Sequence, residues 1–171
     1  KQKSKDFFET VEVTTNASLL TEKKSLDIIN SGLDLIRISI YHTNDSGYKE
    51  ITQRNITYNN IKKNVSFLYQ LKQSLKSNLK IHVKIANAGF SNEILDNFVN
   101  DFANISDSYH IDQLMGWSNS DKNDWKLGLD DKGSGMDGES KLKNRIVCPE
   151  PFYKLAINFN GTVSICCVDW S

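Results

Sequence analysis

The sequence predicts an α/β fold with a parallel sheet, followed by a small cysteine-containing unit. Over residues 1–117, strand patterns with period-two alternation take turns with apolar stripes of helical period. Such alternation implies that helices connect the strands, which therefore run parallel and are joined by right-handed crossovers. Residues 118–144 are rich in Gly, Asp and Ser and predict a linker. Residues 145–171 predict a separate hairpin unit.

Four apolar segments with alternating side chains are expected to be strands, at residues 8–14, 33–41, 79–86 and 109–117. Each helix expected between them begins after a Ser or Thr that can cap its first turn, at Thr21, Thr57 and Ser91. Gly32 is expected to end the first helix, because glycine adopts the left-handed conformation common after a helix. The residues that follow the second strand read as a polar loop.

The second and third strands share a polar face, which is unusual for strands of a parallel sheet. Period-two alternation places Arg37 and Ser39 on that face of the second strand, and His82 and Lys84 on that face of the third. Two interpretations remain open. The face lines a lumen or cleft that holds a polar ligand, or Lys80 and Lys84 lie at an exposed sheet edge.

The composition gives no electrostatic argument for binding to nucleic acid or to an acidic membrane surface. The 21 basic and 21 acidic residues give a formal net charge of zero. The apolar runs are too short for a membrane-spanning helix, and the first residues carry no apolar stretch typical of a secretion signal. We therefore expect a cytoplasmic protein without nucleic-acid or membrane partners.

The strongest chemical signal is a pair of cysteines separated by a fixed pattern. Cys148 is followed by twelve residues, Gly161, four residues and Cys166. Cysteine thiolates brought together by a hairpin commonly bind an iron–sulfur cluster or zinc, and clustered cysteines in a reducing compartment favour metal over disulfides. The alternative is that these are inert core residues. Cys167 points away from its neighbour on a strand, so a core thiol is expected there.

The dipeptide Asn160-Gly161 predicts a hairpin with a two-residue turn. That register would place Phe159 opposite Thr162 and Leu155 opposite Cys166. Cys148 precedes the outgoing strand, so it is expected to fold back toward the base of the same hairpin.

The residues around these cysteines resemble the opening of a SPASM domain. The resemblance covers about the last 24 residues and rests on five segments: Cys148-Pro149, Pro151-Phe152, Leu155-Ala156-Ile157, Asn160-Gly161-Thr162-Val163 and Cys166-Cys167-Val168-Asp169. In that family these cysteines help to ligate an auxiliary [4Fe–4S] cluster. The resemblance therefore implies that Cys148 and Cys166 are metal ligands.

The first part of the chain is similar to the middle of a radical SAM barrel. Residues 13–20 resemble its third strand and Thr-Asn-Gly turn, with Ala17 in place of the glycine. Residues 31–40 resemble the following helix end and fourth strand, and residues 48–54 resemble the loop after that strand. The resemblance implies a parallel-stranded partial (β/α) barrel over residues 1–117.

By this resemblance, the intact enzyme would cleave S-adenosylmethionine reductively to a 5′-deoxyadenosyl radical that abstracts hydrogen from a substrate such as a residue in a peptide. The implied cofactors are S-adenosylmethionine and [4Fe–4S] clusters, and the implied electron donor is a flavodoxin or ferredoxin. Ser39, Arg54 and Asn16 are the expected cofactor-binding residues, because Ser39 and Arg54 suit hydroxyls and a carboxylate. Alternatively, Ser39 only fills space and Arg54 is a solvated loop charge.

The catalytic cluster of the family is bound by a Cys-x3-Cys-x2-Cys loop, and no cysteine precedes Cys148. We expect that loop and two further βα units to precede Lys1 in the intact enzyme, so that the isolated chain does not cleave S-adenosylmethionine. Two other hypotheses remain: a non-enzymatic α/β binding module with a zinc-binding hairpin, and a degenerate half-barrel that serves as a scaffold. The sequence that precedes Lys1 would distinguish them.

Overall fold

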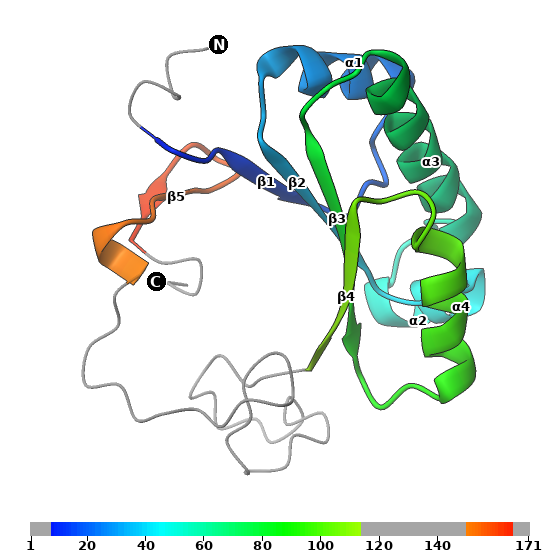
Figure 1. Cartoon of the computed structure of the whole chain (residues 1–171). Coiled ribbons are helices and arrows are strands. Elements are labelled where there is room, and N and C mark those ends of the chain that lie inside the picture. Colours follow the sequence, from blue (N-terminus) through cyan, green and yellow to red (C-terminus); the bar gives the residue numbers. More distant parts are fainter. Residues whose placement is uncertain (1–7, 114–149, 166–171) are drawn as a thin grey trace. The chain divides into compact units, whose positions relative to one another are not determined.

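The computed structural model describes residues 8–113 and 150–165, and the chain divides into two units, residues 1–114 and 115–171. The described part of the first unit alternates strands and helices (Figure 1). In chain order these are β1 (Glu12–Thr15), α1 (Glu22–Ser31), β2 (Leu35–Ile40), α2 (Asp45–Thr52), α3 (Tyr58–Ser74), β3 (Lys80–Asn87), α4 (Asn92–Phe102) and β4 (Ser108–Gln113).

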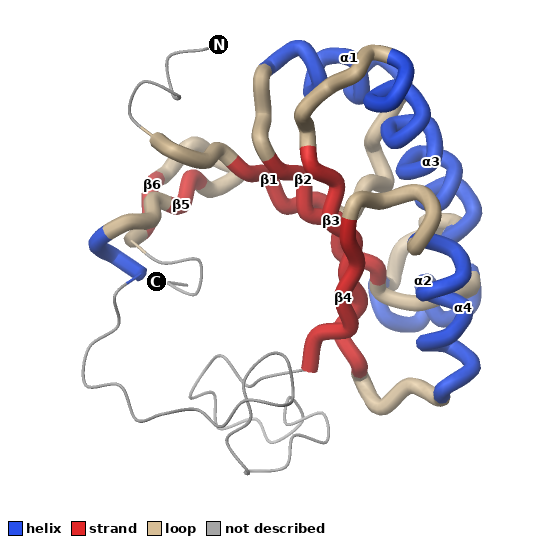
Figure 2. Tube along the Cα trace, in the orientation of Figure 1, coloured by secondary structure: helices blue, strands red, loops and turns tan. Residues whose placement is uncertain are grey.

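The four strands form one parallel sheet in the order β1-β2-β3-β4, which confirms the predicted parallel α/β arrangement. Each strand pairs with the next one along the chain. Because successive right-handed crossovers in one direction bring their helices to the same side, the helices all cover one face of the sheet (Figure 2). Within the described residues, no helix covers the other face.

The hydrophobic core lies between the sheet and these helices. On β2 and β3 every second side chain is at most 1% exposed, namely Ile36, Ile38, Ile40, Ile81, Val83 and Ile85. The buried helix residues of the same core include Ile61, Val65 and Leu68 of α3 and Phe98 and Phe102 of α4. Burial of these side chains fixes which face of each strand points away from the helices.

Helix α1 follows the sequence prediction at both ends. The Thr21 hydroxyl accepts a hydrogen bond from the Lys24 amide at 3.3 Å, and Gly32 has the left-handed φ of 75°. On the side that faces the core, Ser25 is buried and Ile28 and Ile29 are partly buried, whereas Leu26 is 42% exposed.

The first strand begins later than predicted. β1 starts at Glu12, because the Val11 amide donates to the Asp34 carboxylate at 2.9 Å instead of joining the strand ladder. The predicted strand at residues 109–117 is described only as far as Gln113, and its remainder lies outside the described residues.

Helix α2 replaces the polar loop that the sequence predicted. The Asn44 side chain caps it by accepting from the Gly47 amide at 2.8 Å, and Tyr48 is fully buried. Gly47 argued against a helix in the sequence, because glycine disfavours helix interiors. It is needed there because a Cβ at this position would come within 2.2 Å of the His42 ring.

The cap of α3 also differs from the prediction. Thr57 occupies the N-cap position, but its side chain forms no capping hydrogen bond. The Tyr58 amide instead donates to Oδ1 of Asp45 at 2.6 Å, so a residue of α2 caps the next helix.

We expect Asp45→Ala to lower the free energy of unfolding by about 1–2 kcal/mol, the usual effect of losing a side-chain cap. Urea unfolding followed by circular dichroism measures this. Asp45→Asn retains an acceptor and should cost only a few tenths of that amount. Thr57→Ala is the matched control, and a larger loss for Thr57→Ala than for Asp45→Ala would contradict the assignment.

The second unit contains a short hairpin with a different register from the predicted one. β5 (Ala156–Ile157) and β6 (Val163–Ser164) are antiparallel, with Ile157 opposite Val163, and they follow a 3-10 turn at Glu150–Phe152. The Asn158 amide donates to the Thr162 carbonyl at 2.9 Å, which leaves three residues in the connection.

The two-residue turn is therefore wrong, and Phe159 does not face Thr162. Gly161 has a φ of 83° and its amide donates to the Asn158 carbonyl at 2.9 Å, so a type I turn is followed by a left-handed glycine. The predicted pairing of Leu155 with Cys166 relied on the two-residue register, and Cys166 lies outside the described residues.

Candidate ligand-binding face

The helix-free side of the β1–β4 sheet carries the polar residues that the sequence predicted. We call it the polar face and define it by the side chains of Arg37, Ser39, His82, Lys84, Ser108, His110 and Asp112. The strand register places Arg37, His82 and Ser108 at one level across β2, β3 and β4. Ser39, Lys84 and His110 form the next level.

This register confirms that Arg37, Ser39, His82 and Lys84 share one face of a parallel sheet. It also excludes the sheet-edge interpretation for Lys84. β3 pairs with β2 on one side and with β4 on the other, so Lys84 lies on an interior strand.

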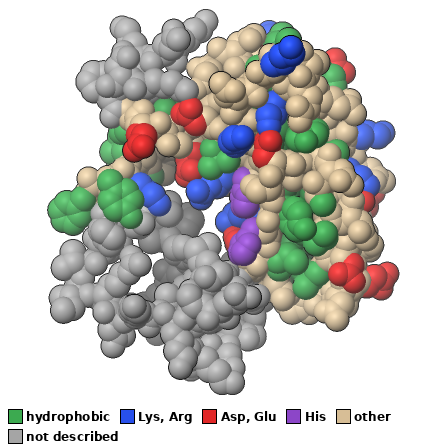
Figure 3. All heavy atoms as spheres, viewed as in Figure 1, with side chains coloured by type: hydrophobic (Ala, Val, Ile, Leu, Met, Phe, Trp, Pro, Cys, Tyr) green, Lys and Arg blue, Asp and Glu red, His purple; other side chains and the backbone are tan. Residues whose placement is uncertain are grey.

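Charged and polar side chains of the polar face pair across neighbouring strands. Lys84 Nζ donates to Oδ2 of Asp112 at 2.6 Å, and His110 Nε2 lies 3.8 Å from the other oxygen of this carboxylate. His82 Nδ1 lies 2.8 Å from the Ser108 hydroxyl oxygen. The space-filling view shows histidine and basic side chains gathered on this side of the first unit (Figure 3).

The polar face ends in an ion pair at the β1 edge. The Arg37 guanidinium lies 3.1 Å from the Glu12 carboxylate, and both side chains are about two-fifths exposed. An ion pair this exposed contributes little to stability, since water solvates both partners well. Arg37 can therefore exchange Glu12 for another anion at low cost.

The surroundings of His82 disfavour its protonated form. Burial and the neighbouring Arg37 guanidinium lower the pKa of His82 below its ordinary value. Of the other charged groups nearby, Asp112 raises it, whereas His110 and Lys84 lower it. Within residues 8–113, the basic groups thus have a larger combined effect on this pKa than the Asp112 carboxylate.

The three predicted cofactor-binding residues occupy different positions. Ser39 is half-buried on the polar face. Asn16 directly follows β1, where its side-chain oxygen accepts from the Ser18 amide at 3.1 Å and from the Ser18 hydroxyl at 2.8 Å. Arg54 is exposed in the loop between α2 and α3, and within the described part of the chain no hydrogen bond or ion pair joins it to either residue.

The turn after β1 has the left-handed backbone conformation that favours glycine, although Ala17 occupies this position. Ala17 has a φ of 58° and is only 1% exposed. Its carbonyl accepts from the Asn64 side chain at 2.9 Å. A non-glycine residue in this left-handed conformation is strained, and here burial of the methyl group and the Asn64 hydrogen bond hold it in place.

The predicted metal ligands Cys148 and Cys166 lie outside the described residues, as does Cys167. Within the described ranges, no three His, Cys, Asp or Glu side chains are placed to hold a metal ion. The same ranges include no helix with the length and apolarity needed to cross a membrane.

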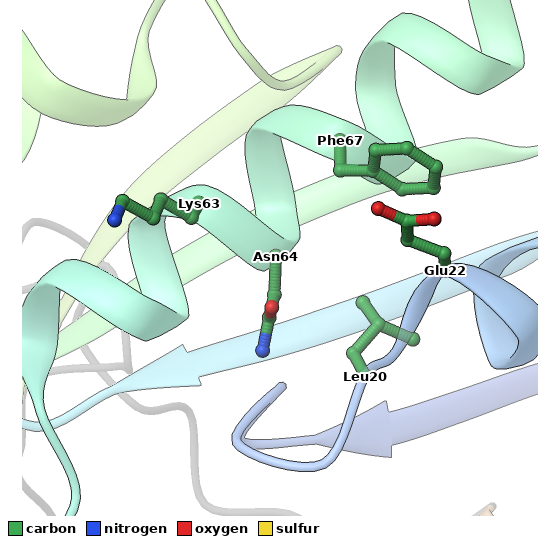
Figure 4. Close-up of a pocket in the computed structure, with 5 residues that line it drawn as sticks. All are labelled: Leu20, Glu22, Lys63, Asn64 and Phe67. Atoms are coloured by element: carbon green, nitrogen blue, oxygen red, sulfur yellow. The ribbon is translucent and has the colours of Figure 1, made fainter.

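A separate pocket of about 210 Å³ lies on the helix side, between the β1–α1 connection and α3 (Figure 4). Leu20, Glu22, Lys63, Asn64 and Phe67 line it. The Asn64 side chain in this lining already donates to the Ala17 carbonyl, and the charged residues Glu22 and Lys63 have opposite signs. Nothing in this lining selects a particular ligand.

Sequence reasoning missed the contribution of β4 to the polar face. Ser108, His110 and Asp112 alternate with Tyr109 and Ile111 in the same period-two pattern that revealed the other strands. This alternation places His110 on the polar face, level with Lys84.

Comparison with known proteins leaves the family open. No family model matches the chain. The chain is 26% identical over 165 residues to an uncharacterized protein, MJ0804, of Methanocaldococcus jannaschii, and the match covers 95% of this chain and 52% of that protein. The chain thus spans about half the length of the curated relative that it matches.

Proposed function

We propose that the intact protein is a radical SAM enzyme with a SPASM-type auxiliary domain, and that residues 1–117 form the later part of its barrel. The observation that carries the proposal is the polar, helix-free face of a parallel sheet whose strands follow chain order.

The arrangement of helices favours a barrel segment over the other common parallel fold. Doubly wound sheets reverse their strand order and place helices on both faces. A (β/α) barrel keeps strands in chain order with every helix outside, and its inner face can hold a polar ligand. The sequential order and the one-sided helices of this sheet support the second arrangement. The longer relative leaves room for the further strands that closure requires.

The residues at the carboxyl ends of β1 and β2 suit the cofactor. Parallel α/β sheets bind ligands at that end of their strands. Ser39 offers a hydroxyl on the polar face, and the side-chain oxygen of Asn16 holds a turn whose left-handed Ala17 occupies the expected glycine position. Arg54 is an exposed guanidinium that could bind the methionyl carboxylate in a bidentate manner.

When bound, S-adenosylmethionine and a [4Fe–4S] cluster would supply radical chemistry, the abstraction of a hydrogen atom from the substrate after one-electron cleavage of the cofactor with release of methionine. The electron would come from a flavodoxin or ferredoxin, and the substrate would be a residue of a peptide. The residues of this chain bind and orient the cofactor on the polar face. Cys148 and Cys166 would ligate the auxiliary cluster beside the β5–β6 hairpin, with further ligands from beyond Ser171.

The decisive experiment uses the full-length gene product, purified without oxygen. With dithionite and S-adenosylmethionine it should form 5′-deoxyadenosine, whereas the 171-residue chain should form none above a control with iron and sulfide alone. Elemental analysis should find iron and sulfide. Stoichiometric zinc without 5′-deoxyadenosine would instead support the binding module with a zinc hairpin and would contradict this proposal.

A further inference from the structure

The centre of the polar face gathers four basic side chains in a small area. Arg37 and His82 are paired residues of β2 and β3, and Lys84 and His110 are paired residues of β3 and β4. Neighbouring strands lie about 4.8 Å apart, and alternate residues of a strand lie about 6.6 Å apart. A single phosphate or carboxylate placed there could contact two or more of these groups.

Among the described residues, Glu12 and Asp112 pair with these groups, and their positions differ. Glu12 lies at the β1 edge and binds Arg37 in an exposed ion pair. Asp112 has a side chain only 12% exposed and is bound by Lys84. An incoming anion can therefore replace Glu12 at Arg37, while Asp112 keeps Lys84 in position. A cation has no such opening, because both carboxylates are engaged and the neighbouring groups are basic.

The His82–Ser108 pair completes the set of donors. If His82 Nδ1 accepts a hydrogen bond from the Ser108 hydroxyl, the ring carries its proton on Nε2, and this N–H can donate to a ligand. A bound anion would favour this tautomer, and also the protonated ring. Burial is the main cause of the lowered pKa of His82, and the charges of Arg37, His110 and Lys84 add to it, so a bound anion would oppose the part that these charges contribute.

We propose that the polar face binds an anionic group, a carboxylate or a phosphate, between Arg37 and His82. In the intact protein this group would belong to the substrate, so the proposal names a substrate class for the enzyme proposed above. The site itself rests only on the polar face and not on radical chemistry, and its test requires neither cluster nor cofactor.

The test is an NMR titration of the three histidine rings in the 171-residue chain, with inorganic phosphate in one arm and succinate in the other. Either ligand, when bound, should raise the pKa of His82 by about 1 and perturb the ring signals of His110. By linkage, the ligand should then bind several-fold more tightly at pH 6 than at pH 8. His42 is an internal reference, because its ring packs against Phe90, with ring centroids 5.2 Å apart.

Arg37→Gln should weaken binding at least about tenfold, while Lys63→Gln on α3 is the matched control and should bind as the parent does. A response to phosphate alone assigns a phosphorylated ligand, and a response to succinate alone assigns a carboxylate. Equal shifts of all three histidines, matched by sodium chloride of the same ionic strength, would overturn the site. So would an unchanged affinity in Arg37→Gln. None of these results depends on whether the full-length protein forms 5′-deoxyadenosine.

Discussion

Asp107→Asn should lower the free energy of unfolding by about 3 kcal/mol, because it leaves a buried ammonium without its counter-ion. Lys72, in α3, has a side chain only 7% exposed, and its ammonium donates to the Asp107 carboxylate. The other carboxylate oxygen accepts from the Ile81 amide at 2.7 Å. The side-chain oxygen of an asparagine can still accept from the Ile81 amide, but its side-chain NH2 group then faces the Lys72 ammonium, and two donors cannot pair with each other.

Two variants test whether burial causes this loss. Lys72→Met removes the buried charge and leaves Asp107 bonded to the Ile81 amide, so we expect a loss of about 1 kcal/mol or less. Lys62→Met breaks the comparable pair with Asp101, whose side chains are 40% and 24% exposed, and should also cost at most about 1 kcal/mol. Similar losses for Asp107→Asn and Lys62→Met in urea unfolding would contradict the explanation.

The effect of Asp107→Asn should depend on pH. Burial alone would raise the pKa of Asp107, but the hydrogen bonds from Lys72 and the Ile81 amide, with the charges of Lys72 and Lys80, lower it overall. A carboxylate with a lowered folded-state pKa stabilises the fold above its unfolded-state pKa of about 4, and this contribution is lost as the pH falls through the folded-state value. The difference in free energy of unfolding between the parent and Asp107→Asn should therefore be largest near pH 7 and should shrink below about pH 4.

Period-two alternation allowed the sheet and its polar face to be predicted, because burial on one side of a strand leaves a regular signature. Ile81, Val83 and Ile85 point into the core, so His82 and Lys84 must point away from it. What alternation could not give was the partner of each polar residue. Asp112 reaches Lys84 only because β4 pairs with β3 in a particular register, and nothing local in the sequence encodes that register.

Two of the errors lie where a side-chain oxygen binds a backbone N–H in a way that the local pattern does not predict. Thr57 has the sequence features of a helix cap, yet Asp45, twelve residues earlier, caps the helix. Asn160-Gly161 suggests a two-residue turn, yet the Asn160 side chain accepts from the Thr162 amide at 3.0 Å within a three-residue connection. In both places a side-chain oxygen satisfies a backbone N–H at the end of an element, and the simple cap or turn pattern does not include that bond.

The largest expected effect on activity comes from filling the polar face. Ser39→Phe in the full-length protein should reduce 5′-deoxyadenosine formation by about 100-fold or more, because even a small displacement of a bound reactant has a large effect on rate. Ser39 lies two residues after Arg37 on β2 and level with Lys84, so a phenyl ring there would occupy the surface on which the proposed function places the cofactor. Its side chain points away from the core, and the circular dichroism spectrum should therefore be unchanged.

Ser39→Ala and Ser74→Phe separate the possible reasons for such a loss. If the Ser39 hydroxyl binds the cofactor, its removal should raise the KM for S-adenosylmethionine up to about tenfold, the effect of one hydrogen bond, with little change in kcat. If Ser39 only fills space, Ser39→Ala leaves KM unchanged while Ser39→Phe still blocks the face. Ser74 lies exposed at the end of α3, so Ser74→Phe introduces the same ring on the helix side and should retain full activity. Full activity in Ser39→Phe would mean that the cofactor does not bind on the polar face, which would remove the main support for the proposed function.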